Sequence, residues 1–149
     1  MLLIIVFSLT LSGCWFNKKV PMDQINNEGV YNYRNEALNF SLDLPEEFIY
    51  YQTQSKEGAG YKDIEFFVPT SDTAYSQEVA GYAKPFLIRA YEEKTWESLG
   101  ESVKEGFNEL AKGSGRVYFV KFWREAPADW RSKWTEESAT KITGSFKVN

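Results

Sequence analysis

The sequence predicts an α+β domain built on a mainly antiparallel β-sheet that is flanked by helices. Several segments alternate between apolar and polar residues, as strands with one covered face do. Two later segments instead place apolar residues at spacings of three and four, as helices do. Most of the strands precede the helices, which favours antiparallel pairing. We expect one domain over residues 30–149, because the remaining chain is too short for two.

The first half of this domain has the period of two that strands show. Alternation over residues 38–44 predicts a strand that ends at Pro45. Residues 48–52 predict a second strand, and residues 55–60, with two glycines, predict a turn. Alternation returns over residues 61–68, where we expect a third strand.

The second half of the domain combines covered strands with a helix. The polar residues 70–83 predict a long loop. Residues 86–91 and 117–123 are apolar on both faces, which is typical of central strands covered on both sides. Between these strands, apolar residues recur at helical spacing from Trp96 to Leu110, so the sequence predicts a helix there.

The ends of the two helices have sequence signals of their own. Thr95 is suited to the N-cap of the first helix and Gly113 to its C-cap. A second helix is expected after Pro127, with Trp130, Trp134 and Ile142 on one side of it. The apolar positions of these elements predict a core that includes Phe40, Leu42, Phe66, Phe86, Val103, Phe107 and Phe119.

The only cysteine of the chain follows a short apolar stretch. The segment Leu11-Ser12-Gly13-Cys14 resembles the lipobox of bacterial lipoprotein precursors. In that family a signal peptidase cuts before the cysteine, and the thiol then carries a diacylglycerol. The apolar stretch is shorter than the roughly 20 residues that span a bilayer, which suits a signal peptide. The alternative is a buried structural Cys14 in a short apolar strand.

The lipobox resemblance implies a location and an N-terminal organisation. Residues 1–13 would be the signal peptide, and residues 14–29 the lipidated cysteine followed by a flexible linker. Acylated Cys14 would bind membrane lipid and hold the domain on the extracytoplasmic side of a cell membrane or outer membrane.

A second resemblance concerns the domain itself. The segment from Tyr31 to Pro45, which includes Phe40-Ser41-Leu42, is similar to the N-terminal motif of PsbP-like domains, and Ile142-Thr143-Gly144-Ser145-Phe146-Lys147 is similar to their C-terminal motif. The resemblance implies an α/β/α sandwich in which an antiparallel sheet lies between helices. Asn39 stands where that family has glycine, and a left-handed backbone at this position would tolerate Asn. Function does not follow from this resemblance.

Composition excludes several classes of function. The net charge of -4 and the pI of 5.0 disfavour a nucleic-acid partner, which would require a basic surface. The chain has no histidine, which excludes Ser-His-Asp and Cys-His catalysis and the commonest transition-metal ligand. No calcium-loop spacing is present, so we expect neither a metal nor a cofactor.

Two features leave hydrolytic chemistry open as an alternative. Asp63 and Glu65 alternate with apolar residues, so they are expected to point outward together, either as solvated surface or as a carboxylate pair for glycan hydrolysis. Ser114 beside Lys112 permits a Ser-Lys dyad, although Gly113-Ser114-Gly115 is more simply a turn. We expect no catalytic residues and no enzyme activity.

The strongest candidate for a binding surface is the segment after the last central strand. It interleaves aromatic and cationic side chains, which dominate many binding interfaces, at Trp123, Arg124, Trp130, Arg131 and Trp134. The alternative is that the aromatic residues only pack the core. The sequence therefore predicts a lipid-anchored, non-enzymatic binding or envelope-assembly module with an envelope protein or glycan as partner. A carboxylate-dependent hydrolase and a small-ligand carrier are the alternative functions.

Overall fold

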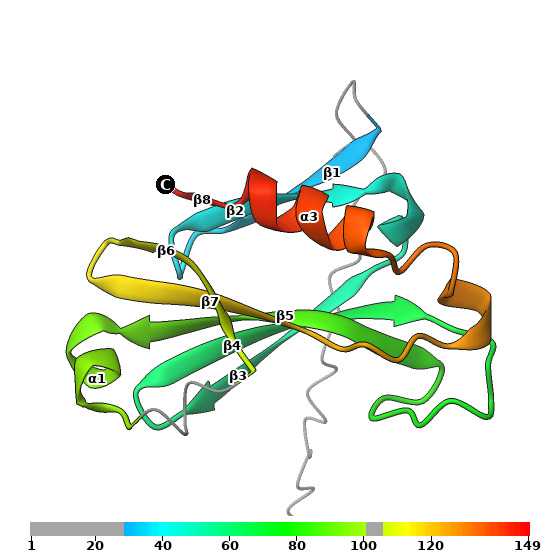
Figure 1. Ribbon diagram of the computed structural model, residues 1–149, viewed down its shortest axis with the longest axis horizontal. Coiled ribbons are helices and arrows are strands. Elements are labelled where there is room, and N and C mark those ends of the chain that lie inside the picture. Colours follow the sequence, from blue (N-terminus) through cyan, green and yellow to red (C-terminus); the bar gives the residue numbers. More distant parts are fainter. Residues whose placement is uncertain (1–28, 101–105) are drawn as a thin grey trace, which may run out of the picture.

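The computed structural model describes residues 29–100 and 106–149, which form a mixed α+β fold with two antiparallel sheets (Figure 1). The smaller sheet has the order β1-β2-β8, with strands Val30–Asn35, Phe40–Pro45 and Lys147–Val148. The larger sheet has the order β3-β4-β5-β7-β6. Its strands in chain order are β3 Gln52–Gly58, β4 Tyr61–Pro69, β5 Tyr82–Glu92, β6 Asn108–Gly113 and β7 Arg116–Phe122. The α+β class with antiparallel pairing is therefore confirmed.

Two α-helices and two short 3₁₀ turns complete the described part of the fold. Helix α3 (Glu136–Ser145) lies with the smaller sheet over one face of the larger sheet (Figure 1). Helix α1 (Glu93–Ser98) follows β5 at one end of the larger sheet. The 3₁₀ turns are η2 (Glu46–Phe48) and η3 (Ala128–Trp130).

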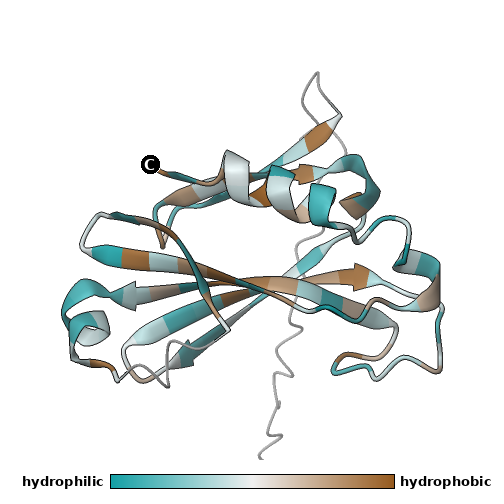
Figure 2. Cartoon of the chain, viewed as in Figure 1, coloured by the Kyte–Doolittle hydropathy of each residue, from teal (hydrophilic) through white to brown (hydrophobic). Residues whose placement is uncertain are grey.

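The main core lies between the larger sheet and the layer formed by the smaller sheet and α3. Phe66 and Phe86, on neighbouring strands, stack with ring centroids 4.3 Å apart. Phe40 and Leu42 join them from the smaller sheet, so four of the predicted core residues are confirmed. Apolar residues lie on the strands of both layers in Figure 2. Burial of aromatic side chains of this size is the main stabilising contribution available to a domain without disulfides.

A smaller cluster covers part of the opposite face of the larger sheet. Tyr91 and Phe119 are buried there, and Trp96 of α1 packs on Phe119 with ring centroids 4.1 Å apart. Phe119 is therefore a core residue, as predicted, but of this second cluster. β5 and β7 are inner strands with a neighbouring strand on each side. This confirms the expectation that residues 86–91 and 117–123 form central strands.

The prediction of a long helix between these two strands, from Trp96 to Leu110, is wrong. α1 ends at Ser98, and the chain from Asn108 to Gly113 is strand β6, paired with β7. A two-residue turn, Ser114-Gly115, joins β6 to β7. Both residues have positive φ, 52° at Ser114 and 69° at Gly115, as a two-residue hairpin turn requires. Phe107 is half-buried against the second cluster rather than in the main core. Val103 lies outside the described residues.

Two further boundaries differ from the expectation. Phe48 belongs to η2, and β3 begins only at Gln52 and runs through the expected turn to Gly58. The actual turn is Ala59-Gly60, where Gly60 has φ +77°.

The second expected helix begins later than predicted. α3 starts at Glu136, because Thr135 caps it by accepting a hydrogen bond from Ser138 N. Trp130 and Trp134 precede this helix, while Ile142 is buried on its inner side as expected.

The two segments that resemble PsbP-like motifs lie side by side. β8 pairs with β2, and Ser145 Oγ at the end of α3 accepts a hydrogen bond from Asp43 N at 2.8 Å. Asn39, which stands where PsbP-like domains have glycine, has a left-handed backbone with φ 61°. Its carbonyl accepts a hydrogen bond from Asn149 N at 2.8 Å.

Candidate functional site

The first candidate site is a hollow of about 550 Å³ at one end of the larger sheet. The loop over residues 70–81 forms one wall, and the ends of β4 and β5 and the residues after β7 form the rest. We call it the first hollow; its lining residues are Phe67, Ala74, Tyr75, Ser76, Glu78, Tyr82, Lys84, Trp123, Arg124 and Glu125. Tyr75, Tyr82 and Trp123 are half-buried, so each ring contributes an accessible apolar surface.

Two aspartates fasten this loop to the segment that contains η3. The Asp129 carboxylate accepts hydrogen bonds from Thr70 Oγ1 at 2.7 Å and from Ser71 N at 2.9 Å. The Asp72 carboxylate accepts them from Ala74 N at 3.0 Å and from Ala128 N at 2.8 Å. These backbone donors hold the pKa of both carboxyl groups below the usual range, because they stabilise the ionised form.

A network of four charged side chains fixes the other end of the loop. Glu65 lies 2.9 Å from Lys84 Nζ and 2.8 Å from Lys56 Nζ, the latter an ion pair rather than a directed hydrogen bond. Glu78, on the loop, pairs with the same two lysines. Hydrogen bonds from Lys56 and then Lys84 lower the pKa of Glu78. The ammonium of Lys84 also lies 4.8 Å from the centre of the Trp123 ring.

A second hollow, of about 560 Å³, adjoins the first. It shares Ala74, Tyr75, Arg124 and Glu125 with the first hollow and adds Asp72, Ala126, Arg131 and Trp134. The hydroxyl of Tyr75 lies 3.4 Å from the carbonyl oxygen of Glu125, to which it donates. Tyr75 therefore stands between the two hollows and is braced by the chain that follows β7.

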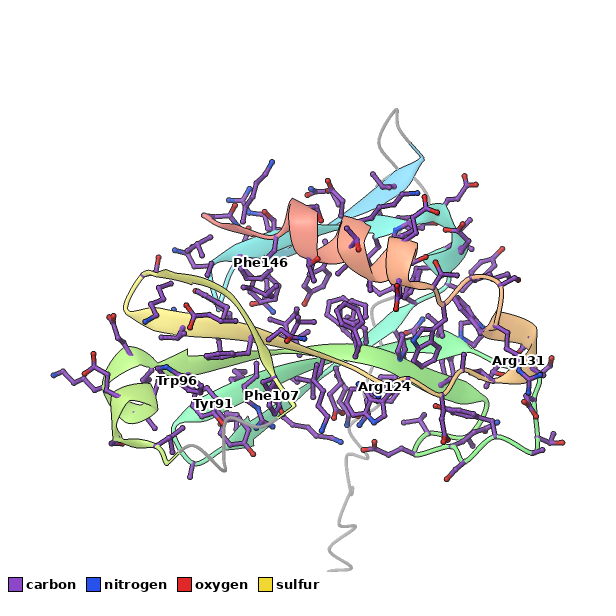
Figure 3. All side chains as sticks on the ribbon, viewed as in Figure 1. Tyr91, Trp96, Phe107, Arg124, Arg131 and Phe146 are labelled. Carbon is purple, nitrogen blue, oxygen red and sulfur yellow. The ribbon has the colours of Figure 1, made fainter. Side chains whose placement is uncertain are left out.

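The structure brings together four of the five predicted binding residues. Trp123 and Arg124 line the first hollow, and Arg124, Arg131 and Trp134 line the second. Both arginines are exposed on the segment that follows β7, Arg131 at one end of the molecule and Arg124 nearer its middle (Figure 3). Among the described residues, neither arginine has a carboxylate partner within ion-pair distance.

Trp130 is a core residue, which corrects its prediction as part of the binding surface. Its exposed fraction is 4%, and its ring packs edge-on against Phe48 with centroids 5.4 Å apart. Its indole N–H donates a hydrogen bond to the Pro69 carbonyl oxygen at 2.7 Å. The indole therefore ties η3 to the end of β4, because both its apolar surface and its only donor are satisfied inside the protein.

Asp63 and Glu65 share one face of the larger sheet, as predicted, but they are not solvated. Their exposed fractions are 5% and 4%. Asp63 forms a bidentate pair with Arg89, with both N–O distances 2.7 Å. The guanidinium lies 3.9 Å from the Tyr61 ring centre and 4.5 Å from that of Phe107. The interpretation of these two residues as solvated surface is wrong, because this face is covered by other side chains.

The charge state of Arg89 follows from these neighbours. Burial by itself lowers the pKa of the guanidinium, but the hydrogen bonds and charge of Asp63, with a smaller contribution from Tyr91, raise it further than burial lowers it. Arg89 is therefore a permanent cation, and Asp63 is its counter-ion. Tyr91, Trp96 and Phe107 gather at this part of the sheet in Figure 3, at the end away from the two hollows.

Ser114, the other residue that the sequence suggested for catalysis, takes part in a turn. Ser114 lies in the β6–β7 turn, where its hydroxyl accepts a hydrogen bond from Asn39 Nδ2 at 3.1 Å. No group of three or more metal-ligating side chains occurs within residues 29–100 and 106–149. In the same ranges, no helix has the length and apolar character needed to cross a membrane. Cys14 lies outside the described residues.

Of the residues that line the first hollow, only Trp123 and Arg124 were predicted as site residues. Tyr75, Glu78 and Tyr82 belong to the polar stretch that the sequence identified only as a loop. Two tyrosines in an otherwise small and polar stretch were the available signal, because loops seldom need large amphipathic side chains for packing alone.

Comparisons of this chain with protein-family models, with curated proteins and with solved structures find no match.

Proposed function

We propose that the protein is a membrane-anchored extracytoplasmic lipoprotein whose domain is a non-enzymatic binding or envelope-assembly module. The observation that carries the proposal is the convergence of Trp123, Arg124, Arg131 and Trp134 on two adjoining hollows around Tyr75. These residues come from separate parts of the segment after β7. Their convergence at an accessible surface favours binding over core packing for these four side chains.

The energetics of such a surface support this reading. Aromatic and arginine side chains contribute most of the binding free energy at protein interfaces and are enriched there. Arg124 and Arg131 have no acidic partner among the described residues, so a ligand does not have to displace an internal ion pair to reach them.

The carboxylate-dependent hydrolase is less well supported. A general acid must exchange its proton during the reaction, and a nucleophilic carboxylate must reach its substrate. Asp63 is held by Arg89, and Glu65 by Lys56 and Lys84, with both carboxylates buried. These pairs explain the two acidic residues as buried counter-ions of partly exposed cations.

The small-ligand carrier has one observation in its favour, which is the size of the first hollow. However, such a carrier would need an apolar cavity between the sheet and a helix, and that space is filled by stacked side chains such as Phe66 and Phe86.

Membrane anchoring rests on the resemblance of Leu11-Ser12-Gly13-Cys14 to a lipobox. A diacylglycerol on the thiol would anchor the protein more firmly than a single acyl chain. A tethered domain meets neighbouring membrane proteins at a high effective concentration, so a modest surface is sufficient for partner binding. The partner we propose is an envelope protein or glycan, reached from the extracytoplasmic side of the cell membrane or outer membrane.

The finer assignment to PsbP-like domains is also a proposal. It is supported by the two motif segments meeting through β2, β8 and α3, and by the left-handed backbone of Asn39. A crystal structure that superposes on a PsbP-like domain over both sheets and α3 would support the assignment, and a different strand connectivity would reject it.

In-cell crosslinking of the lipidated protein tests the proposed function. We expect Arg124→Gln and Trp134→Ala to reduce partner capture while the protein stays folded. The matched control is Tyr50→Ala, because Tyr50 is 64% exposed and lines neither hollow. Capture that is equal in all three variants and the parent would contradict binding at the hollows.

A further inference from the structure

The side chains that line the first hollow carry equal numbers of positive and negative charges. Lys84 and Arg124 are cationic, and Glu78 and Glu125 are anionic. An anionic ligand would meet the two carboxylates, and a cationic ligand would meet the ammonium and the guanidinium. An uncharged ligand with many hydroxyl groups can use both kinds of side chain, because carboxylates accept hydrogen bonds and Arg and Lys donate them.

The apolar part of the lining has the character that a sugar ring requires. Tyr75, Tyr82 and Trp123 are half-buried around the opening, and Phe67 is buried beneath them. A pyranose has C–H groups on its faces and hydroxyl groups on its rim. Aromatic walls with a few polar groups between them therefore match both parts of such a ligand.

We propose that the first hollow binds an uncharged saccharide segment of an envelope glycan. This inference rests on the proposed function and names the ligand class for the same site. A volume of about 550 Å³ lies within the range of ligand sites in proteins.

Binding of an extended peptide is less well supported by the backbone around the hollow. Peptides that bind along a sheet require free backbone donors and acceptors at an edge. Beside the hollow, Trp123 N already donates to Pro85 O at 2.9 Å, and Thr70 N donates to Gly81 O at 2.9 Å. β5 is also paired on both sides there, because Phe86 faces Phe66 of β4 and Phe122 of β7.

The loop that forms one wall is held in place before any ligand binds. Gln77 donates to the carbonyl oxygen of Asp72 at 3.0 Å and accepts from Gly81 N. Glu78 pairs with Lys56 and Lys84, which fixes the side of the loop that faces the sheet. A wall that is already ordered loses little entropy on binding, which favours recognition of weakly binding ligands such as sugars.

Titration of the full lipidated chain with defined oligosaccharides tests the inference. The probes are two uncharged tetramers, of N-acetylglucosamine and of glucose, with a tetrameric uronate and a deacetylated glucosamine tetramer as charged comparisons. The protein is kept in a detergent without a sugar headgroup, and binding is measured by tryptophan fluorescence and saturation-transfer NMR. We expect saturable binding of at least one uncharged tetramer, and weaker binding of both charged ones.

The variants distinguish the first hollow from the rest of the surface. Tyr82→Ala and Glu125→Gln should each weaken binding of the uncharged tetramer about tenfold, a change of 1.4 kcal/mol in binding free energy. Tyr50→Ala, at an exposed position that lines neither hollow, should leave it unchanged. Glu125 is exposed, so Glu125→Gln remains informative if Tyr82→Ala fails to fold.

The saccharide inference is overturned if neither uncharged tetramer binds, if a charged one binds more tightly, or if both first-hollow variants bind like the parent. Partner capture that still depends on Arg124 and Trp134 would then leave the proposed function standing. Loss of that dependence together with intact saccharide binding would reject the crosslinked partner interface but support the hollow as a glycan site.

Discussion

Replacing Asp63 by asparagine tests whether this carboxylate is structural. The side chains of Arg89 and Asp63 are 15% and 7% exposed, and the amide would keep the shape while removing the counter-charge. Breaking a buried ion pair from one side costs about 3–5 kcal/mol, because the remaining charge stays desolvated. The guanidinium of Arg89 keeps its contacts with the Tyr61 and Phe107 rings, and these contacts offset about 1 kcal/mol of the cost of leaving its charge without a counter-ion. We therefore expect Asp63→Asn to lower the free energy of unfolding by about 2–4 kcal/mol.

Urea unfolding followed by tryptophan fluorescence measures this loss. With a slope of about 2 kcal/mol per molar urea, the midpoint should fall by about 1–2 M. Glu57→Gln is the matched control, because Glu57 is 77% exposed and its pair with Lys62 is a surface pair. Exposed pairs contribute about 0–1 kcal/mol, so the control midpoint should hardly move.

The double variant Asp63→Leu with Arg89→Met separates charge from packing. Replacing both partners of a buried pair by apolar residues is often close to neutral, so we expect most of the stability to return. The reasoning is refuted if Asp63→Asn unfolds at the parent's urea concentration, or if the double variant is as unstable as the single one. Hydrolysis of a glycan or peptide that disappears in Asp63→Asn, with the fold intact, would instead establish a catalytic role.

Four further outcomes are expected. Trp130→Ala should lower the free energy of unfolding by about 3–5 kcal/mol in urea, whereas Trp134→Ala should mainly weaken partner capture. Cys14→Ser should leave an unprocessed precursor that takes up no labelled fatty acid, and normal processing and labelling would reject the anchoring. Asn39→Gly should change thermal stability by less than about 0.5 kcal/mol, since glycine adopts the observed φ without strain. Hydrogen bonds from Lys56 and Lys84 lower the pKa of Glu78 in the folded state below its ordinary value of 4.5. These pairs therefore stabilise the loop above pH 4.5 and are lost as the pH falls from there through the folded pKa, so the protection of residues 70–81 against amide exchange, relative to the intrinsic exchange rate, should fall in acid.

Strands were predictable where one alternating face packs against the core. The expectation of a strand over residues 61–68 agrees with β4 (Tyr61–Pro69), because Ile64, Phe66 and Val68 are all buried. Apolar residues at every second position predict this contact with the core, since successive side chains of a strand point to opposite faces. The α+β class followed from such segments, but the division into two sheets did not, because alternation does not specify which strands pair.

The prediction of a helix from Trp96 to Leu110 was wrong because the apolar spacing of this segment had a different cause. Phe107 packs against the second cluster, while Leu110 packs against the main core. A half-covered edge strand with a register shift between Glu109 and Ala111 places apolar residues three apart without being a helix. The hairpin turn at Ser114-Gly115 was the stronger local signal, since both residues adopt the positive φ of a two-residue turn.

The candidate site was only partly predictable, because its walls are assembled from distant segments. Sequence proximity suggested that Trp123 and Arg124 act together, and they do lie together in the first hollow. Nothing local connects them with Tyr75, which is brought there by bonds such as that from Thr70 Oγ1 to Asp129, 59 residues away. Each such bond joins the loop to the chain after β7, so the shape of the hollow depends on the completed sheet. A variant that frees the loop, such as Asp129→Asn, should therefore impair binding without altering any residue that lines the first hollow.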